Sequence, residues 1–484
     1  MANDLTDLKP SALWKHFQEF LKIPHCSGNE KELGDYIISV AERLNLEYKR
    51  DDVGNVVVSK NASKGSENST GVILQGHLDM VCEKNSDVDH DFQKDAIQTE
   101  RNGDWVKAKG TTLGADNGIG GCAALAIMEN NDIKHPPLEF LFTVEEETGL
   151  TGATHIPKGF LKGKKLLNLD SEDEGEFTIG CAGGADTQIF VPFQTEDKKS
   201  DQILKLELSG FKGGHSGIDI NLGRGNAIKL LARILWKVSQ DISFQLFHIK
   251  GGNLRNAIPR ESSAVIGIQS EDHDRFQQLV EETFAEIRNE FNPVEPNADF
   301  SLTKTDEDPG EAISAQEQIK ILNLIFSIPH GVISMHPEIE GLVETSTNLA
   351  VVHTKNDKIQ IVCSTRSSTA SALEATRDSI NAVVDLADAE IVRENGYPGW
   401  KPNLESELLK TLKKVYQDTF DKKAHVAAVH AGLECGIIGE KFPGMDMISF
   451  GPTIEHPHSP DERVHTGTVE KFWNFLINLL EKLA

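Results

Sequence analysis

Apolar residues recur at helical spacing at the start of the chain. Residues 5–23 and 29–46 both place them three or four positions apart, which predicts two amphipathic helices. Residues 47–60 surround a polar turn and predict a short hairpin. The chain therefore opens with two helices and a pair of strands.

Three later segments, 71–80, 137–149 and 164–173, share another pattern. Each is a short apolar run that ends in polar residues. This is typical of a strand buried in a parallel sheet, whose carboxyl end carries chemistry. Residues 114–130 follow the pattern of a loop that leads into a helix of small residues, which can pack closely on a sheet. The first third therefore predicts an α/β domain with a mostly parallel sheet.

The middle of the chain, from about residue 201 to 394, contains two similar passes of strands and helices. The first has strand 203–211, helix 226–238, strands 244–252 and 264–270, helix 274–291 and strand 298–304. The second has helix 315–328, strands 347–355 and 358–366, helix 371–387 and strand 390–396. The pattern predicts an inserted α+β domain made of two ferredoxin-like halves.

After this insertion the chain returns to the pattern of its first third. Residues 405–420 and 469–483 predict amphipathic helices, and residues 445–451 predict an apolar strand. We therefore expect the first and last segments to form one discontinuous α/β domain.

Length and composition fit two soluble domains. At 484 residues and 38% hydrophobic content the chain can build two cores, and we place the α/β domain at 1–190 and 396–484 and the insertion at 191–395. The net charge of −26 disfavours nucleic acid and anionic lipid as partners. Since the sequence shows neither a basic, apolar leader nor a run of about 18 apolar residues, we expect neither secretion nor membrane insertion.

The six cysteines are scattered and form no C-x-x-C pair. This distribution predicts buried free thiols in a reducing compartment, so we expect the protein to be cytoplasmic. The cysteines are Cys26, Cys82, Cys122, Cys181, Cys363 and Cys435.

Residue types that bind metals follow several predicted strands. Two imidazoles and three carboxylates can hold a pair of divalent ions, and a further carboxylate can act on a bound water, as hydrolysis of an amide requires. The set therefore predicts a dinuclear metal hydrolase. Its candidates are His77 and Asp79 in GHLDM, Asp116 in GADNG, Glu146 and Glu147 in VEEETG, Asp170 in LNLDSE, and His458 in HPHSPDE.

Each motif also has a simpler explanation. An isolated H-x-D is most often structural, and GADNG alone is most often an Asx turn or a helix N-cap. The GIGG that follows suggests a phosphate loop, but the lack of an adjacent lysine disfavours a nucleotide site. Residues 145–147 could be a solvated helix face, and HPHSPDE a surface loop in which His456 competes with His458. The presence of all five motifs in this order favours the metal site.

Longer motifs carry a more specific resemblance. KAKGTTLGADNGIG, GCAGG, KGGHSG, RNAIPRE, VETS, YPGW, HAGLECG and SFGPT are distributed over most of the chain. On these motifs the sequence resembles the dinuclear zinc amidohydrolases that include aminoacylases, carboxypeptidase G and the bacterial dipeptidases. Within that clan it is most similar to the aminoacyl-histidine dipeptidases, also called peptidase D or Xaa-His dipeptidases.

The resemblance implies a role for each candidate in the α/β domain, which would be the catalytic domain. Glu146 would be the general base that removes a proton from a water bridging the metals. Asp79 would hydrogen-bond the imidazole of His77 and fix its tautomer. A cis peptide bond is implied after Asp116. The implied metal ligands are Asp116 as the bridge, His77 and Asp170 for one ion, and Glu147 and His458 for the other.

The resemblance makes the insertion a lid over the substrate. His215 in KGGHSG would stabilise the oxyanion of the tetrahedral intermediate. Asn256, Arg366 and the backbone at Gly432 would hold the C-terminal carboxylate of the substrate. From the residues alone, His215 could instead cap a turn, and Arg366 could face solvent. HAGLECG departs from the glycine-rich serine-aspartate motif of the carboxypeptidases, so those relatives are no guide at Gly432.

The implied activity is that of a dinuclear zinc metallo-dipeptidase that hydrolyses unblocked dipeptides, preferentially Xaa-His. Two divalent ions are the implied cofactors, with Zn²⁺ favoured over Co²⁺ and Mn²⁺. Small dipeptides are the expected partners, and a homodimer is compatible with the sequence. A broad-specificity dipeptidase and an N-acyl amino acid hydrolase are alternatives with the same chemistry. A non-catalytic metal-binding scaffold is disfavoured by Glu146, because a structural site has no use for a spare base.

Overall fold

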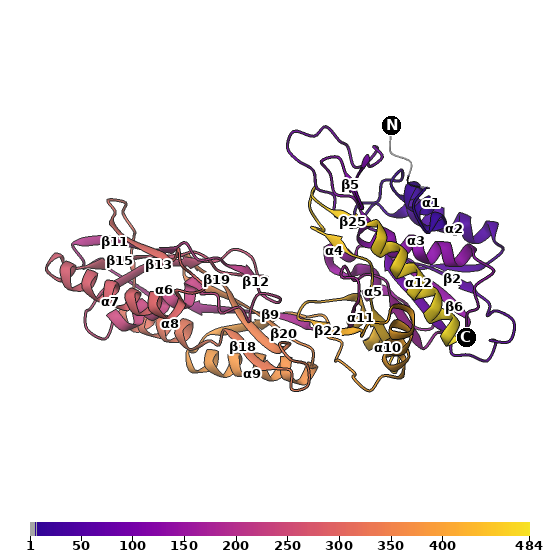
Figure 1. Cartoon of the computed structure of the whole chain (residues 1–484). Helices are drawn as coiled ribbons and strands as arrows, with labels where there is room; N and C mark the ends of the chain where they lie inside the picture. The colour runs from indigo at the N-terminus through magenta and orange to yellow at the C-terminus, as the bar shows by residue number, and fades with distance from the viewer. Residues whose placement is uncertain (1–4, 6) are drawn as a thin grey trace. The chain divides into compact units, whose positions relative to one another are not determined.

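The computed structural model describes residues 5 and 7–484, which divide into two compact units (Figure 1). Unit 1 is Met1–Cys181, Trp400–Ala428 and Leu433–Ala484, and unit 2 is Ala182–Gly399 with Val429–Gly432. These boundaries differ from the 190/191 and 395/396 boundaries placed from the sequence. The first one shifts because residues 183–192 form a strand of the sheet in unit 2.

Unit 1 is built on a sheet of eight strands within the described residues. In spatial order they are β1 (Glu47–Arg50), β2 (Val56–Lys60), β6 (Leu138–Thr143), β3 (Val72–His77), β7 (Lys165–Asn168), β23 (Asp446–Ser449), β8 (Glu176–Cys181) and β22 (His425–Val429). The central strands β6, β3, β7 and β23 are parallel, whereas β1, β2 and β8 pair antiparallel. Every residue of β3 and β6 is buried. The predicted α/β class, with apolar parallel strands at its centre, is confirmed.

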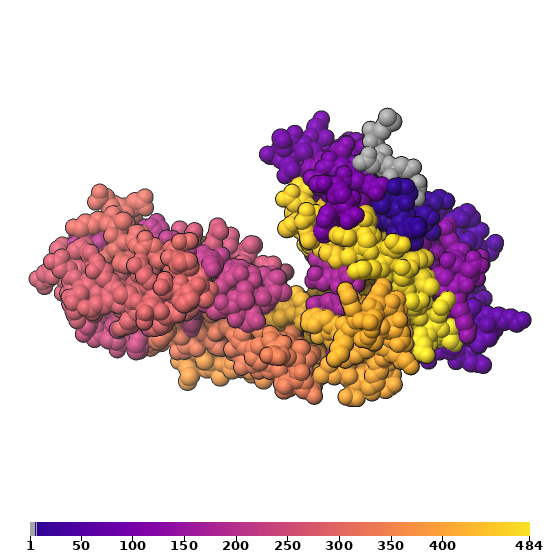
Figure 2. All heavy atoms as spheres, in the orientation of Figure 1, coloured from indigo at the N-terminus to yellow at the C-terminus, as the bar shows by residue number. Residues whose placement is uncertain are grey.

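Helices from both ends of the chain belong to unit 1. They are α1 (Ser11–Phe20), α2 (Lys31–Arg43), α3 (Ala115–Glu129), α4 (Glu146–Gly149), α5 (Thr151–His155), α10 (Glu407–Phe420), α11 (Glu434–Lys441) and α12 (Thr466–Leu483). A smaller sheet joins β24 (Ile454–Glu455), β25 (Arg463–His465), β5 (Trp105–Ala108) and β4 (Thr99–Asn102). Figure 2 shows the C-terminal residues, in yellow, among the indigo and purple residues of the first third. The predicted helix 5–23 is shorter in the structure, where proline at position 10 precedes the first turn of α1; residue 6 lies outside the described part.

Helix α3 is buried along almost its whole length, as its small residues predicted. The carboxyl end of α3 is bound by Lys60, a residue of β2. The Lys60 ammonium, buried in the core, donates to the carbonyl oxygens of Ile127 and Met128, both at 3.1 Å, and to that of Asn130. The Ile127 carbonyl also accepts the N–H of Asn130 at 3.2 Å. Carbonyls at the end of a helix are short of donors within the helix, so the Lys60 cation supports the end of α3 opposite to the one that carries Asp116.

We expect Lys60→Met to lower the free energy of unfolding by about 1–3 kcal/mol, because the carbonyls of Ile127, Met128 and Asn130 would each lose the ammonium as a donor. Urea denaturation followed by circular dichroism measures the change. Lys64→Met, which removes the same charge at an exposed position nearby, is the matched control and should leave the unfolding midpoint nearly unchanged. Equal midpoints for the two variants would contradict a capping role.

Unit 2 is built on a single sheet of nine strands within the described residues. Its order is β16 (Asp299–Lys304), β11 (Gln202–Ser209), β15 (Ser262–Ile268), β13 (Gln245–Gly251), β19 (Val343–Lys355), β20 (Lys358–Ser367), β9 (Gly183–Pro192) and β21 (Glu390–Arg393), with β18 (Gly331–Met335) beside β19. The two predicted halves meet where β13 pairs with β19. Strands β9 and β18 were not predicted.

Four helices pack on one face of this sheet (Figure 1): α6 (Ala227–Val238), α7 (His273–Phe291), α8 (Ala315–Ser327) and α9 (Ala370–Leu386). A short helix, η1 (Ser270–Asp272), precedes α7, and the short strand pairs β10 (Thr195–Glu196) with β17 (Ala312–Ile313) and β12 (Gly214–His215) with β14 (Ala257–Ile258) complete the unit. One continuous apolar core spans both halves. The predicted α+β insertion of two β/α halves is confirmed. Among residues 5 and 7–484, no helix has the length and apolar content needed to cross a membrane.

Candidate metal centre and substrate-binding residues

The predicted ligands in unit 1 gather at one edge of the sheet. His77 is the last residue of β3, Glu146 and Glu147 follow β6, and Asp170 follows β7. These three strands are parallel neighbours, so their carboxyl ends meet at the same edge. The amino end of α3 adds Asp116.

Asp116 faces both imidazoles. Its Oδ1 lies 3.3 Å from His77 Nε2, and its Oδ2 lies 3.1 Å from His458 Nε2. Each imidazole nitrogen has a second carboxylate beside it, Asp170 Oδ1 at 3.3 Å from His77 and Glu147 Oε1 at 3.0 Å from His458. Two groups of candidate ligands therefore share Asp116, and a third group consists of His77, Glu146 and Glu147; within each group the ligand atoms lie within 4.8 Å of one another.

The chemistry of these atoms fits divalent cations. His77 Nδ1 lies 2.9 Å from the carbonyl oxygen of Asp79 and donates to it, which leaves a lone pair on Nε2 directed at two carboxylates. Asp170 Oδ1 and Glu147 Oε1 are buried and have no hydrogen-bond partner among the described residues. Lone pairs that face one another at this distance need a proton or a cation between them. Imidazole nitrogen with carboxylate oxygen is a common ligand set for zinc.

The cluster shifts the pKa values of its members. Burial, followed by the nearby carboxylates Asp170, Glu434 and Glu147, raises the pKa of Glu146 well above its usual value. Burial likewise raises the pKa of Asp170 to about 6. The hydrogen bond to Asp116 and the adjacent Glu147 carboxylate raise the pKa of His458 to about 11. Negative charge is thus concentrated in a buried place, which favours the binding of cations.

Asp79 holds the backbone that carries Glu146 and Glu147. Its Oδ1 accepts the N–H of Glu146 at 2.9 Å, and its Oδ2 accepts the N–H of Glu147 at 3.1 Å and the hydroxyl of Ser27 at 2.7 Å. The resemblance implied that Asp79 hydrogen-bonds the imidazole of His77. In the structure the carbonyl oxygen of Asp79 makes that bond, while the carboxylate oxygen is 3.5 Å from His77 Nδ1.

The first turn of α3 is irregular where it presents Asp116. Asp116 and Asn117 have non-helical backbone angles, and the peptide bond between them is cis, as the resemblance implied. Asn117 Nδ2 donates to the carbonyl of Leu169 at 2.6 Å, which ties this turn to the segment before Asp170. A Cβ on Gly76 would lie 2.1 Å from Asn117 Oδ1, so β3 needs glycine there.

His215 in unit 2 has its tautomer fixed by its own turn. Its Nδ1 accepts the N–H groups of Gly217 and Ile218, both at 3.2 Å, so its proton sits on Nε2. Burial and the positive charge of Arg366 lower the pKa of His215, which keeps the ring neutral. The ring accepts within its turn and retains an N–H donor on Nε2; the contact of this donor with an oxyanion stays a prediction.

Arg366 is buried rather than facing solvent. Its Nη1 donates to the hydroxyl of Tyr397 at 2.8 Å, and its Nε has no hydrogen-bond partner among the described residues. A Cβ on Gly432 would lie 2.7 Å from the ring of Tyr397, so Gly432 lies against the same ring. Asn256 is exposed, and its carbonyl accepts the N–H of Ser216, next to His215. These contacts bring Arg366 and Gly432 together and place Asn256 beside the turn of His215.

Comparison with known proteins identifies the family. The model of the peptidase family M20/M25/M40 matches residues 73–482. The chain belongs to this family. It is 41% identical to the cytosol non-specific dipeptidase of Escherichia coli (strain K12) over 483 residues, 99% of each chain. The crystal structure of the aminoacylhistidine dipeptidase from Vibrio alginolyticus matches with a TM-score of 0.94 and 41% identity, over 99% of this chain and 98% of that one.

A more distant member shows how far the fold is shared. The aminopeptidase PepT from Bacillus cereus matches with a TM-score of 0.58 and 15% identity, over 98% of this chain and 99% of its own. At this identity the likeness concerns the fold alone. The resemblance drawn from the motifs, to metallopeptidases that include the aminoacyl-histidine dipeptidases, is confirmed by the family and by the two relatives at 41% identity.

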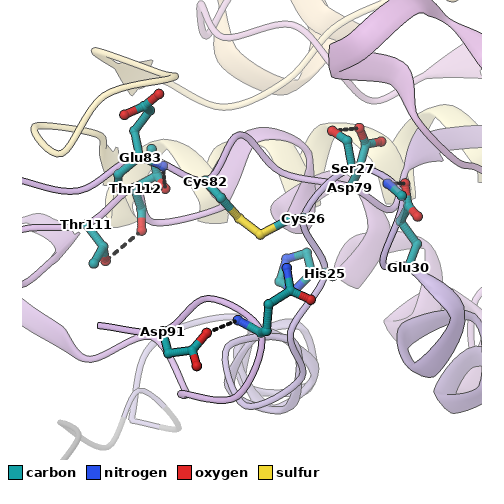
Figure 3. The surroundings of a disulfide bond; sticks show 12 residues. His25, Cys26, Ser27, Glu30, Asp79, Cys82, Glu83, Asp91, Thr111 and Thr112 are labelled. Carbon is teal, nitrogen blue, oxygen red and sulfur yellow. Dashed lines mark hydrogen bonds between the residues drawn. A yellow bond between two sulfur atoms is a disulfide. The ribbon is translucent and has the colours of Figure 1, made fainter. Parts of the chain in front are cut away.

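One sequence prediction is wrong for this M20-family chain. Cys26 and Cys82 form a disulfide (Figure 3), whereas Cys122, Cys181, Cys363 and Cys435 are buried free thiols as predicted. The bonded pair is 56 residues apart in sequence, but Cys26 bridges Met80, so the two segments lie side by side. A spacing rule for cysteines finds only local pairs and misses this one.

Several residues beside the candidate site residues of each unit were not assigned from the sequence. Glu434 is fully buried and accepts from Gln75 Nε2 at 2.6 Å and from the Thr143 hydroxyl at 2.8 Å. Glu462 accepts backbone N–H groups at the start of α3. Tyr397 links Arg366 to Gly432. Glu434 and Tyr397 lie in HAGLECG and YPGW, which carried the resemblance, and Glu462 lies in HPHSPDE, the motif of His458. A motif does not say what its members contact.

Proposed function

We propose that this M20-family peptidase is a metal-dependent dipeptidase that hydrolyses unblocked dipeptides, with Xaa-His preferred. The observation that carries the proposal is the convergence of two imidazoles and three carboxylates with Glu146 beside them. When bound, two divalent ions, with Zn²⁺ favoured, would polarise the scissile carbonyl and lower the pKa of water. The proposed ligands are Asp116 for both ions, His77 and Asp170 for one, and Glu147 and His458 for the other.

Glu146 is the proposed general base. It would take a proton from the attacking water and deliver it to the leaving amine. Its raised pKa suits this exchange, because a carboxylate of ordinary pKa is a weak base near neutral pH. The two bonds from Asp79 to the backbone of Glu146 and Glu147 separate the roles of these neighbours by fixing the direction of each side chain.

The substrate-binding residues of the proposal come from unit 2, the proposed lid. His215 would donate its Nε2–H to the oxyanion, which requires the proton on Nε2 that its turn imposes. Arg366, Asn256 and the backbone at Gly432 would bind the C-terminal carboxylate. The support is the buried guanidinium of Arg366, which keeps a donor, Nε, without a partner among the described residues.

The function is tested by assaying apo and metal-loaded protein on free dipeptides, C-terminally amidated dipeptides and N-acyl amino acids. We expect cleavage of free dipeptides alone, and only by metal-loaded protein. Rapid cleavage of N-acyl amino acids would favour the amidohydrolase alternative. Equal kcat/KM for Xaa-His and Xaa-Ala would favour the broad-specificity dipeptidase. Tight metal binding without turnover of any of these would favour the scaffold.

We also propose that the protein acts in the cytoplasm, as the named location of the E. coli relative suggests. Glutathione keeps cytoplasmic thiols reduced, whereas the structure joins Cys26 and Cys82 in a disulfide, so the redox state of this pair in growing cells tests the location. The cells are quenched rapidly with acid and the thiols are then labelled with a maleimide. Two labelled thiols beyond the four buried free cysteines would support this location.

We expect Arg366→Lys to lower kcat/KM for free Xaa-His about 30- to 1000-fold, equivalent to about 2–4 kcal/mol, because lysine cannot bind a carboxylate bidentately. An amidated substrate should suffer similarly with the native enzyme, and the two losses should not add. A double cycle of both enzymes on both substrates measures this. Arg393→Lys, on an exposed guanidinium paired with Asp378, is the control. Full additivity would show that Arg366 does not bind the carboxylate.

A further inference from the structure

Glu462 connects the start of α3 to the loop that carries His458. Its side chain is 2% exposed. Its Oε2 accepts the backbone N–H groups of Leu113 at 2.7 Å and Gly114 at 3.0 Å. Its Oε1 accepts those of Ala115 at 2.8 Å and Asp116 at 3.2 Å. One carboxylate therefore holds four consecutive N–H groups, the last of which belongs to Asp116.

The start of α3 depends on this contact. The first N–H groups of a helix have no acceptors within the helix, and a negative charge is favourable there. Asp116 and Asn117 have non-helical backbone angles, so the first turn is not held by regular helical hydrogen bonding. Glu462 supplies these acceptors from a distant part of the sequence, and so fixes the backbone from which the Asp116 side chain projects.

The loop that precedes Glu462 in the sequence carries His458. The His458 ring is 51% exposed, and both His456 and His458 have positive φ angles. Glu462 ends this loop immediately before β25, which pairs with β5. Through Glu462 the loop is attached to the segment that carries Asp116, and His458 Nε2 lies 3.1 Å from Asp116 Oδ2.

We propose that Glu462 is a positioning residue for the ion whose ligands are Asp116, Glu147 and His458. It touches neither substrate nor reacting atoms. It acts by holding Asp116 and His458, which come from two separate segments, at the distance at which both contact one ion. The inference rests on the proposed two-ion site. Residues that hold metal ligands from behind typically contribute a factor of 10 to 100 to metal affinity. We therefore expect a change of Glu462 to weaken the binding of this ion by that factor. The ion held by His77, Asp116 and Asp170 should lose less affinity.

The experiment titrates the full-length protein with Zn²⁺ alone against a chromogenic chelator and resolves two dissociation constants. Glu462→Gln keeps the size of the side chain but turns an amide group towards backbone N–H donors. Its matched control is Glu139→Gln. Glu139 is also buried in unit 1 and accepts the N–H groups of Lys162 and Gly163 at 2.8 and 2.7 Å, but it lies near the amino end of β6, away from the ligands.

We expect both variants to lose thermal stability. Only Glu462→Gln should raise one of the two Zn²⁺ dissociation constants, by 10- to 100-fold. Equal weakening of both ions, or unchanged affinities with lower stability, would overturn the inference and leave Glu462 as a cap of α3. If Glu462→Gln does not fold, Glu462→Asp, which keeps the charge with a shorter reach, must show the same selective loss or the inference fails. Native protein that binds two ions without cleaving dipeptides would count against the proposed function and leave this inference in place.

Discussion

Glu146→Gln is expected to lower kcat about 10²- to 10⁴-fold on free dipeptides while two ions stay bound. The amide cannot accept a proton from water, yet it has nearly the same size and leaves the proposed ligands unchanged. Asp79 would still hold the backbone N–H of residue 146, because that contact does not involve the Glu146 side chain. Steady-state kinetics at saturating metal, together with the metal content by mass spectrometry, measure both parts of the expectation.

The matched control is Glu145→Gln, which removes the same charge from the preceding residue and should retain near-native turnover. Glu147→Gln should instead weaken one ion, since Glu147 Oε1 lies beside His458 Nε2. If Glu146→Gln emptied the site and Glu147→Gln did not, the roles of the two residues would be reversed. Near-native kcat for Glu146→Gln would remove Glu146 as the base.

Asp116→Ala is expected to weaken both ions by at least about 10²-fold and to abolish measurable turnover, because Asp116 offers one oxygen to each ligand group. Asp170→Asn should weaken the binding of chiefly one ion, because Asp170 Oδ1 lies beside the imidazole of His77 and not beside that of His458. The difference between the two variants distinguishes a shared ligand from a ligand of a single ion. Equilibrium dialysis against Zn²⁺, with chelator competition, gives both affinities.

Asp173→Asn is the control for these variants, because Asp173 is exposed and close in sequence to Asp170. It should bind two ions with native affinity. An Asp116→Ala protein that kept one ion with unchanged affinity would contradict the bridging role. The proposed function would then need a centre in which the two ions have separate ligand sets.

Local sequence patterns determined much of the fold and most of the proposed centre. The buried strands β3 and β6 were predicted because an apolar run needs both faces covered, and the polar residues after them were placed at the edge where parallel strands end. His77 and Asp170 follow from this rule alone. The helix of small residues, α3, was likewise predicted from its composition. Two residues of the proposed lid, Arg366 and His215, came instead from the resemblance.

The tertiary structure decided the contacts between distant segments. Periodicity and strand ends are local properties, whereas the pairing of Cys26 with Cys82 and the contact of Glu462 with Asp116 depend on how separate segments pack. Strand β9 was missed for the same reason, because its pairing with β20 is long-range. Asp79 shows that the sequence does not determine contacts at the level of single atoms. Its position beside the centre followed from the sequence, but which of its oxygens meets His77 is fixed only by the packed backbone of residues 146 and 147, which takes up the carboxylate.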